Sequence, residues 1–243
     1  MNYKLKRLSV SLLNRIMFYK PTNHNKMKIN TDIVKASARY VSNYFSKNLD
    51  AKFLYHNLSH TTYVVKAVNT LCRVMGVDEH QKKVLLVSAW FHDLGFTQQI
   101  EGHERIGAKL ADEFLKLNGV DEEDIAIVKS CILSTYYPQK PTTLLEELLC
   151  DADLMHLGDK DFLITANLLR KEWELTKAIT YSDTQWNKAN IQFVSAHHFH
   201  TWYCHNNVEK KKNKNIKLLA GKLQSTTHDI FRFNGESYDQ KVA

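Results

Sequence analysis

Residues that interrupt regular secondary structure are scarce in this chain, which contains only 8 Gly and 3 Pro among its 243 residues. A β-sandwich or barrel needs a turn about every ten residues, and Gly and Pro supply many of the backbone angles that such turns require. The scarcity therefore disfavours a fold of many short strands and favours helices. Hydrophobic residues make up 44% of the chain, which is sufficient for a sizeable core and argues against a disordered protein.

Apolar residues recur at the spacing of one helix face from Asp32 onward. We expect helices over about residues 32–45, 59–75, 78–94, 103–118, 121–133, 144–149, 162–177 and 183–206. No alternating strand of useful length and no internal repeat is found in the sequence. The pattern predicts an all-α fold, followed by a loosely ordered tail over residues 225–243.

The formal net charge of +7 is concentrated at the N-terminus. Residues 1–31 contain seven Lys and Arg and no acid, and subtracting these seven from the 33 basic residues leaves 26, equal to the 26 acidic residues. The rest of the chain is therefore neutral, and specific nucleic-acid binding is not expected of it. Residues 1–31 are interpreted as a basic N-terminal arm, either a cationic helix that packs on or frays from the domain, or a membrane-surface helix or organelle-type presequence.

The longest strongly apolar run, Val84–Phe91, is far shorter than the roughly 20 residues that span a bilayer. We therefore expect a soluble protein without a transmembrane segment. The four cysteines show no C-x-x-C spacing, and three of them lie in apolar surroundings, as reduced buried thiols do. A cytoplasmic protein without disulfides is expected, and a homo-oligomer is possible.

Histidines and carboxylates gather near predicted helix ends in four places. The pairs are His56 and His60, His92 and Asp93, His103 and Glu104, and Asp151 and Asp153. Imidazole and carboxylate without thiolate suit a divalent ion such as Mn, Fe, Co, Ni, Mg or Zn. These residues predict one or two metal ions per chain.

The adjacent pair His92-Asp93 is the most informative of these. Neighbouring residues of a helix diverge by about 100°, which is close to the angle between cis ligands of an octahedral ion. A His-Asp pair beside the apolar residues Trp90 and Phe91 also needs a partner for its buried charge, which a metal would supply. The alternative is that both residues cap a helix end and bond each other or the backbone.

Several short blocks occur in an order that resembles the HD superfamily of metal-dependent phosphohydrolases. The order His60, then His92-Asp93, then Asp153 is similar to the H…HD…D signature of that superfamily. The chain also resembles a bacterial branch of predicted HD phosphohydrolases in the blocks Tyr55–His60, Ala89–Gly95, His103–Ala108, Asp151–Gly158 and Leu169–Glu172. The first block resembles cyclic-nucleotide phosphodiesterases as well. The resemblance covers about residues 50–175. It implies an HD-domain helical bundle, which we place at residues 32–224, with a metal site between its helices.

The resemblance implies a role for individual residues. The metal ligands would be His60, His92, Asp93 and Asp153. Asp153 matches the family pattern better than Asp151, which would instead orient a ligand. The first histidine of the phosphodiesterase block is the general acid, and this role would fall to His56. Otherwise His56 only packs or hydrogen-bonds in its loop. Asp93, if it bridges two ions, would also help to orient the nucleophile.

The chain departs from better-known relatives at several positions. Phe96 stands where cyclic-nucleotide phosphodiesterases have a histidine, so a complete second metal site of their kind is not implied. His103 and Glu104 would fill part of that catalytic role, or else they only begin a helix whose dipole Glu104 complements. The motifs of alarmone hydrolases and of cyclic-di-GMP hydrolases are missing. Arg105, Arg170 and Lys171 lie within matched blocks and are candidates for binding substrate phosphates, among which the sequence does not choose; we take Arg105 and Arg170 as the substrate-binding residues.

These patterns predict a metal-dependent phosphohydrolase, either a phosphomonoesterase or a phosphodiesterase. Its substrate would be a small phosphate ester, with a nucleotide or cyclic nucleotide favoured, and metal-activated water would be the nucleophile. The alternative is a nucleotide-sensing HD module with little or no turnover that gates a partner. A diiron oxygenase of the HD type is a third reading, for which the chain offers only His103 as an additional ligand between His92-Asp93 and Asp153.

Overall fold

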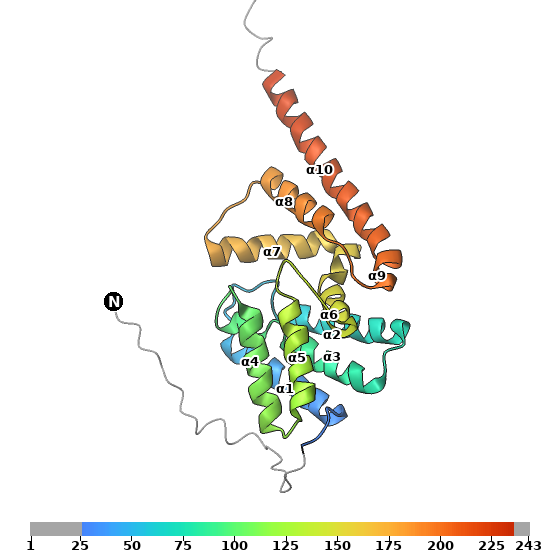
Figure 1. The fold of residues 1–243 in the computed structure, drawn as a ribbon. Helices are drawn as coiled ribbons and strands as arrows, with labels where there is room; N and C mark the ends of the chain where they lie inside the picture. Colours follow the sequence, from blue (N-terminus) through green and yellow to red (C-terminus); the bar gives the residue numbers. More distant parts are fainter. Residues whose placement is uncertain (1–25, 236–243) are drawn as a thin grey trace, which may run out of the picture.

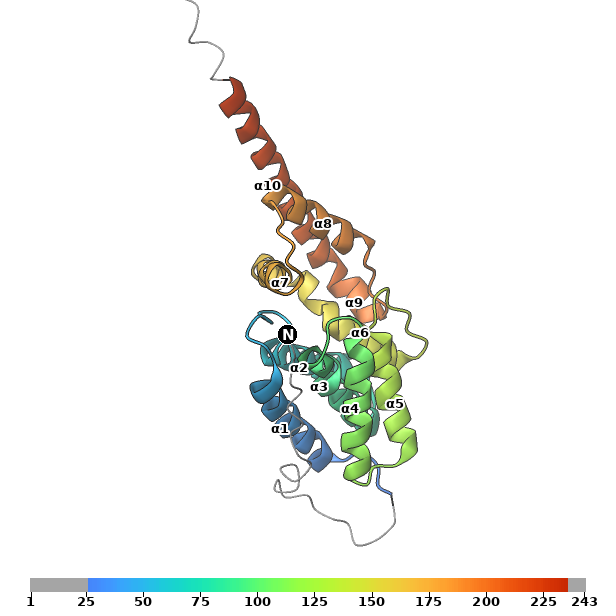
Figure 2. The same cartoon turned by 90° about the vertical axis from the view of Figure 1, so that its left-hand side faces the viewer.

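The structure is a computed structural model that describes residues 26–235 and, for residues 224–235, the backbone alone. The described residues form α-helices, two short 3-10 helices and no β-strand, which confirms the predicted all-α class. The elements are α1 (Thr31–Asn48), α2 (Leu58–Met75), α3 (Glu79–Phe91), η2 (Leu94–Thr97), α4 (His103–Leu117), α5 (Glu122–Ser134), α6 (Leu144–Leu154), η3 (Met155–Gly158), α7 (Phe162–Lys177), α8 (Asp183–Ala196), α9 (Trp202–Asn207) and α10 (Glu209–Gly235). Figure 1 shows α1 to α6 gathered in one body, with α7 and α8 beyond it. Helix α10 projects past the other helices in both views (Figures 1 and 2).

Helix α3 is the central element of the body. It packs against α1, α2, α5 and α6. Its residues Val84–Ala89 and Phe91 are all buried, so this helix is enclosed on every side rather than along one stripe. The apolar run that is too short for a membrane is therefore the core helix of the domain. Each of its large side chains contributes about 1.5–3 kcal/mol by leaving water.

Local sequence signals set the helix boundaries around α3. Asn57 ends the preceding loop and begins α2, because its side chain accepts a hydrogen bond from the Ser59 N–H at 2.8 Å. Asp78 caps α3 in the same way, and Gly76 adopts the left-handed conformation that ends α2. Helix α3 ends at Phe91, before the predicted position, because the chain turns at His92 and Asp93 into η2.

The N-terminal boundary differs from the prediction. Residues 26–31, which we assigned to the basic arm, belong to the folded domain. Ile29 is 2% exposed, and its N–H donates to the buried carboxylate of Asp124 at 2.6 Å. The backbone of Met27 pairs with the segment that precedes α5, and Lys28 lies 2.6 Å from Glu123. The charges within residues 1–31 suggested a separate arm. The acidic residues that pair with Lys26 and Lys28 lie almost 100 residues later in the sequence, so the pattern did not reveal them. The remainder of the arm, residues 1–25, lies outside the described residues.

The C-terminal part also differs from the sequence prediction. The helix expected over residues 183–206 ends at Ala196, and α9 begins only at Trp202. Helix α10 continues to Gly235, so residues 225–235 are helical rather than a loosely ordered tail. Residues 236–243 of that tail lie outside the described residues. The expected boundary at residue 224 therefore falls inside a helix.

Candidate metal centre

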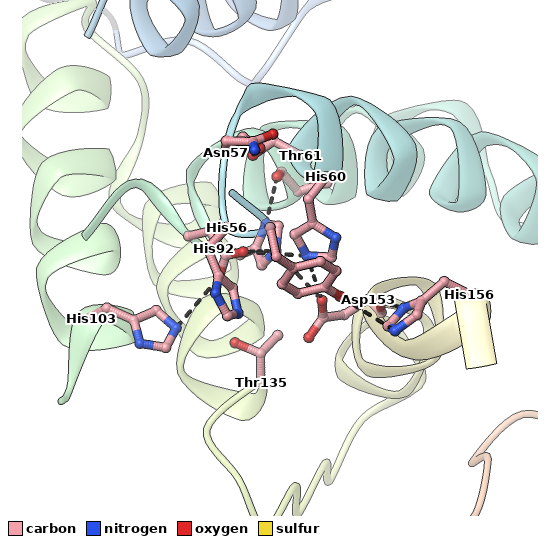
Figure 3. Close-up of polar contacts among 12 residues, drawn as sticks. His56, Asn57, His60, Thr61, His92, His103, Thr135, Asp153 and His156 are labelled. Carbon is pink, nitrogen blue, oxygen red and sulfur yellow. Dashed lines mark hydrogen bonds and ion pairs between the residues drawn. The ribbon is translucent and has the colours of Figure 1, made fainter. Parts of the chain in front are cut away.

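Three helix ends meet at one point and bring the four predicted ligands together. His60 comes from the first turn of α2, His92 and Asp93 from the turn after α3, and Asp153 from the last turn of α6. The His60 Nε2 atom lies 3.1 Å from the Asp153 Oδ1 atom and 3.3 Å from the Asp93 Oδ2 atom. The His92 Nε2 atom lies 3.2 Å from the same Asp93 oxygen (Figure 3). The four donor atoms therefore converge on one small volume.

The hydrogen bonds around His92 indicate which atoms would hold an ion. The His92 Nδ1 atom lies 2.8 Å from the Ala89 carbonyl oxygen, to which it donates, so the neutral ring presents the Nε2 lone pair to the cluster. That Nε2 atom and the Asp93 Oδ2 atom are both buried without a hydrogen-bond partner. A lone pair that faces a carboxylate oxygen needs a cation between them. Two imidazole nitrogens and two carboxylate oxygens fit a divalent metal ion, for which they would be the ligands.

The electrostatics of the cluster agree with this fit. Burial alone would lower the pKa of His60, but the hydrogen bonds and charges of Asp153 and Asp93 raise it to about 8. Burial also opposes protonation of His92, yet Asp93 and Asp153 raise its pKa well above the usual value. Burial would raise the pKa of Asp93, and the neighbouring histidines hold it well below its usual range. The two carboxylates thus favour positive charge at this point, which a proton or a metal ion can supply.

The two aspartates of α6 have different surroundings. Two residues along a helix point about 200° apart, so only one of Asp151 and Asp153 can face the cluster. Asp153 does, whereas the buried carboxylate of Asp151 accepts hydrogen bonds from the His200 N–H at 2.8 Å and from the Thr201 hydroxyl at 2.6 Å. Asp151 therefore fastens the segment before α9 to α6. These contacts tie Asp151 to His200 and Thr201 and not to a candidate ligand, contrary to the orienting role we expected.

His56 forms a dyad with a carboxylate that the sequence analysis did not assign. The Glu172 side chain is 2% exposed and contacts the His56 Nδ1 atom through Oε1. Its Oε2 atom accepts the backbone N–H groups of Tyr55 at 2.8 Å and of His56 at 2.9 Å. Burial would raise the pKa of Glu172, but the hydrogen bonds from His56 and the backbone hold it below the usual value. Glu172 thus fixes the loop and can stabilise a protonated His56. Its presence in a matched block was the only signal in the sequence.

Phe96 lies between two imidazole rings. Its ring stacks on His56 with centroids 4.1 Å apart and on His103 with centroids 3.8 Å apart. The position that holds a histidine in cyclic-nucleotide phosphodiesterases is therefore used here for packing. Phe96 holds His56 and His103 on the same side of the cluster.

His103 and Glu104 lie beside the cluster, at the start of α4. The His103 Nδ1 atom lies 2.9 Å from the Ile100 carbonyl oxygen, and its Nε2 atom lies 3.4 Å from Asp93 Oδ1 and 3.5 Å from Glu104 Oε1. Glu104 is buried, and its Oε2 atom has no hydrogen-bond partner. Although burial lowers the pKa of His103, the Asp93 carboxylate raises it above the usual value. His103 is thus near enough to Asp93 for both side chains to contact one water molecule or ion, and Glu104 lies near the same His103 nitrogen.

Helix α4 reaches this position because of a glycine. A Cβ atom at Gly107 would lie 2.6 Å from the Phe91 carbonyl oxygen and 2.9 Å from the His92 carbonyl oxygen. Such distances are shorter than van der Waals contact, so only glycine lets α4 approach the end of α3 this closely. The position of His92 and that of His103 are therefore coupled through the packing of these two helices.

The two predicted phosphate-binding arginines are not brought to the cluster. Arg170 faces α8, where it binds Asp183 at 2.6 Å, Glu174 at 3.1 Å and the Tyr181 carbonyl oxygen. Its charge is neutralised there, so the structure does not support the substrate-binding role expected of Arg170. Arg105 is exposed on α4, and no contact with the cluster supports the role expected of it. Proximity in sequence to a ligand does not place a side chain on the same helix face.

The rings of Tyr55 and His156 also lie close to the cluster. The Tyr55 ring lies 4.7 Å from the His60 ring and 5.7 Å from the His156 ring, measured between centroids. The His156 Nδ1 atom lies 3.1 Å from the Asp153 backbone oxygen, and burial lowers the pKa of His156 to about 4. His103 and His156 lie on opposite sides of the group in Figure 3. We did not single out His156, although it occurs in the matched block Asp151–Gly158.

Comparison with known families agrees with this geometry. Residues 57–158 match the family model of the HD domain. The chain therefore contains an HD domain, the helical domain of a superfamily of metal-dependent phosphohydrolases that bind divalent metals. The four converging residues lie within the match, whereas His56 and Glu172 lie outside it. No curated protein and no solved structure gave a significant match to the chain. None of the helices in the described part is long and apolar enough to cross a membrane.

Proposed function

We propose that this protein is a metal-dependent phosphohydrolase that hydrolyses a small phosphate ester, with a nucleotide or cyclic nucleotide as the favoured substrate. The observation that carries the proposal is the buried His92 Nε2 lone pair opposite a carboxylate oxygen of Asp93 within the HD domain. When bound, a divalent ion supplies a nucleophilic hydroxide near neutral pH and stabilises charge on the phosphoryl oxygens. His60, His92, Asp93 and Asp153 would hold it.

The remaining steps belong to residues beside the ligands. Asp93 offers Oδ1 on the side of His103, so these two groups are placed to orient a water molecule for attack on phosphorus. His56 would protonate the leaving oxygen, and Glu172 would orient its imidazole through the contact with Nδ1. The His56 side chain is 19% exposed, which leaves its ring accessible to a substrate. The proposal allows for one or two ions per chain, and His103 and Glu104 would help to hold the second.

The alternative proposal is a nucleotide-sensing module without significant turnover. The His56–Glu172 dyad favours an enzyme, because it places an oriented and partly exposed imidazole beside the candidate metal centre. We also propose a cytoplasmic location, which the four buried free cysteines support.

The test is a screen of the purified protein against nucleotides, cyclic nucleotides and nitrophenyl phosphate esters. Mn²⁺, Co²⁺, Ni²⁺ and Mg²⁺ are each compared with protein treated with a chelator. The proposal predicts phosphate release that requires metal and disappears in the Asp93→Ala variant. Tight nucleotide binding with no phosphate release under any of these metals would favour the sensing module.

A further inference from the structure

A cavity adjoins the metal cluster on the side of His156. It has a volume of about 280 Å³ and lies between the start of α2, the segment after η3 and the start of α7. His60 contributes to its wall, so the cavity is in contact with a metal-binding residue. Its other polar lining groups include Tyr55, Tyr63, Asp159 and Asp161. A ligand held at the cluster can therefore extend into this space.

Away from the metal cluster, the charged side chains that line the cavity are acidic. Two carboxylates, Asp159 and Asp161, line it, and no Lys or Arg does. Asp159 is half-buried, and its Oδ2 atom accepts a hydrogen bond from the Tyr63 hydroxyl at 2.7 Å. The backbone of Asp159 is fixed as well, because its carbonyl oxygen accepts a hydrogen bond from Asn215 at 2.9 Å. The wall therefore presents a positioned hydrogen-bond acceptor with negative charge.

We propose that this cavity holds the organic part of the substrate and selects phosphate esters that carry no second anionic group. The inference rests on the proposed function, because it takes the phosphoryl group to lie at the metal cluster. Hydroxyl and ammonium groups can donate hydrogen bonds to Asp159 and Asp161, whereas a second phosphate or a carboxylate is repelled by both. The substrate class is then a monophosphate of a sugar, a nucleoside or an amino alcohol, rather than a diphosphate or triphosphate.

The size of the cavity limits this class further. Small-molecule sites usually measure about 300–1,000 Å³, and this cavity, at about 280 Å³, lies just below that range. It can accommodate a sugar or an amino alcohol and is too small for a whole dinucleotide. The aromatic rings of Tyr55 and Tyr63 provide apolar surface against the carbon skeleton of such a group.

Two phosphonates of matched size and opposite tail charge test the proposal. 2-Aminoethylphosphonate has an ammonium group, 3-phosphonopropionate has a carboxylate, and neither contains a hydrolysable ester bond. Binding of each to the Mn²⁺-loaded full chain is measured by isothermal titration calorimetry. We expect the ammonium ligand to bind at least about tenfold more tightly, since one tail is attracted and the other repelled at a half-buried site.

The variant Asp159→Asn identifies the source of the preference. An asparagine carbonyl can still accept the Tyr63 hydroxyl, so the fold is retained while the charge is removed. The preference should shrink several-fold in this variant and persist in the control Glu113→Gln, which removes a charge from the exposed face of α4. Metal content is measured on every preparation. Equal affinity for the two phosphonates, binding of neither, or an unchanged preference in Asp159→Asn would overturn the inference. Hydrolysis of nitrophenyl phosphate by the same preparations tests the proposed function separately.

Discussion

Glu172→Gln tests the assignment of the general acid. In the structure, one oxygen of Glu172 accepts two backbone N–H groups and the other contacts the His56 ring. A glutamine carbonyl can keep the two backbone hydrogen bonds, so the loop that carries His56 retains its position. The glutamine NH₂ group would then face the ring and donate to it. The variant therefore removes the negative charge that stabilises the imidazolium and leaves the surrounding packing unchanged.

The expected size of the effect comes from this single contact. A buried hydrogen bond to a charged group contributes about 1.5–3 kcal/mol. If His56 is the acid, most of this energy is lost in the transition state, and kcat falls by about 10- to 150-fold. The loss applies to substrates with an alkoxide leaving group, which needs a proton. Nitrophenolate leaves without one, so kcat for a nitrophenyl ester should change only a few-fold.

The assay compares kcat on a nucleotide with kcat on a nitrophenyl phosphate diester. His56→Ala serves as the matched variant, because it removes the acid itself and should show the same division between the two substrates. The double variant should be no slower than His56→Ala alone, since the two residues act as a unit. Equal losses on both substrates, or loss of bound metal from Glu172→Gln, would refute the assignment of His56 as the acid.

Three further predictions concern packing and pH. Gly107→Ala should destabilise the fold by about 1–3 kcal/mol and lower metal occupancy, because the added Cβ lies 2.6 Å from the Phe91 carbonyl oxygen. Gly221→Ala, with no atom within 4 Å of its Cβ, is the control and should be neutral or stabilising in thermal unfolding. Deletion of residues 1–31 should cost about 3 kcal/mol, because it removes the buried Ile29 and the Asn30 helix cap, whereas a chain that begins at Lys26 retains both. A similar unfolding midpoint for the two truncations would contradict this. Metal affinity should fall by at least about tenfold per pH unit below pH 8 in titration calorimetry, because the pKa of His60 is raised to about 8, the pKa of His92 is raised well above its usual value, and protons on both rings compete with the ion. A pH-independent affinity would show that His60 is not a ligand.

The helical fold and the cluster of candidate ligands could be predicted because their signals are local. The apolar run Val84–Phe91 marked α3, and the pair His92-Asp93 at its end marked the candidate site. Burial of Ile29 was not predictable in the same way, since its partner Asp124 lies 95 residues later. The spacing of residue types along a helix carries no information on contacts between residues so far apart in the sequence. The wrong boundary of the basic arm follows from this limit.

The same limit separates the predicted residues that lie at the cluster from the neighbours that the sequence did not reveal. His56 was identified through its block, but nothing in the sequence shows that Glu172, 116 residues away, reaches its ring. Arg170 lies only two residues before Glu172, and the helix turns it toward Asp183 instead of the site. The choice between Asp151 and Asp153 likewise depends on which face of α6 meets the cluster. The type and order of residues in the sequence suggest which side chains are ligands. Which other side chains contact them depends on how the helices pack.

The metal content of the purified protein, measured by inductively coupled plasma mass spectrometry, tests the central claim most directly. Wild-type protein loaded with Mn²⁺ and then desalted should retain at least one ion per chain. Asp93→Ala should retain almost none, because the Asp93 oxygens face His60, His92 and His103. Glu113→Gln, on the exposed face of α4, should match the wild type. Full occupancy in a folded Asp93→Ala variant, or no metal in the folded wild type, would contradict the assignment of this cluster as a metal centre.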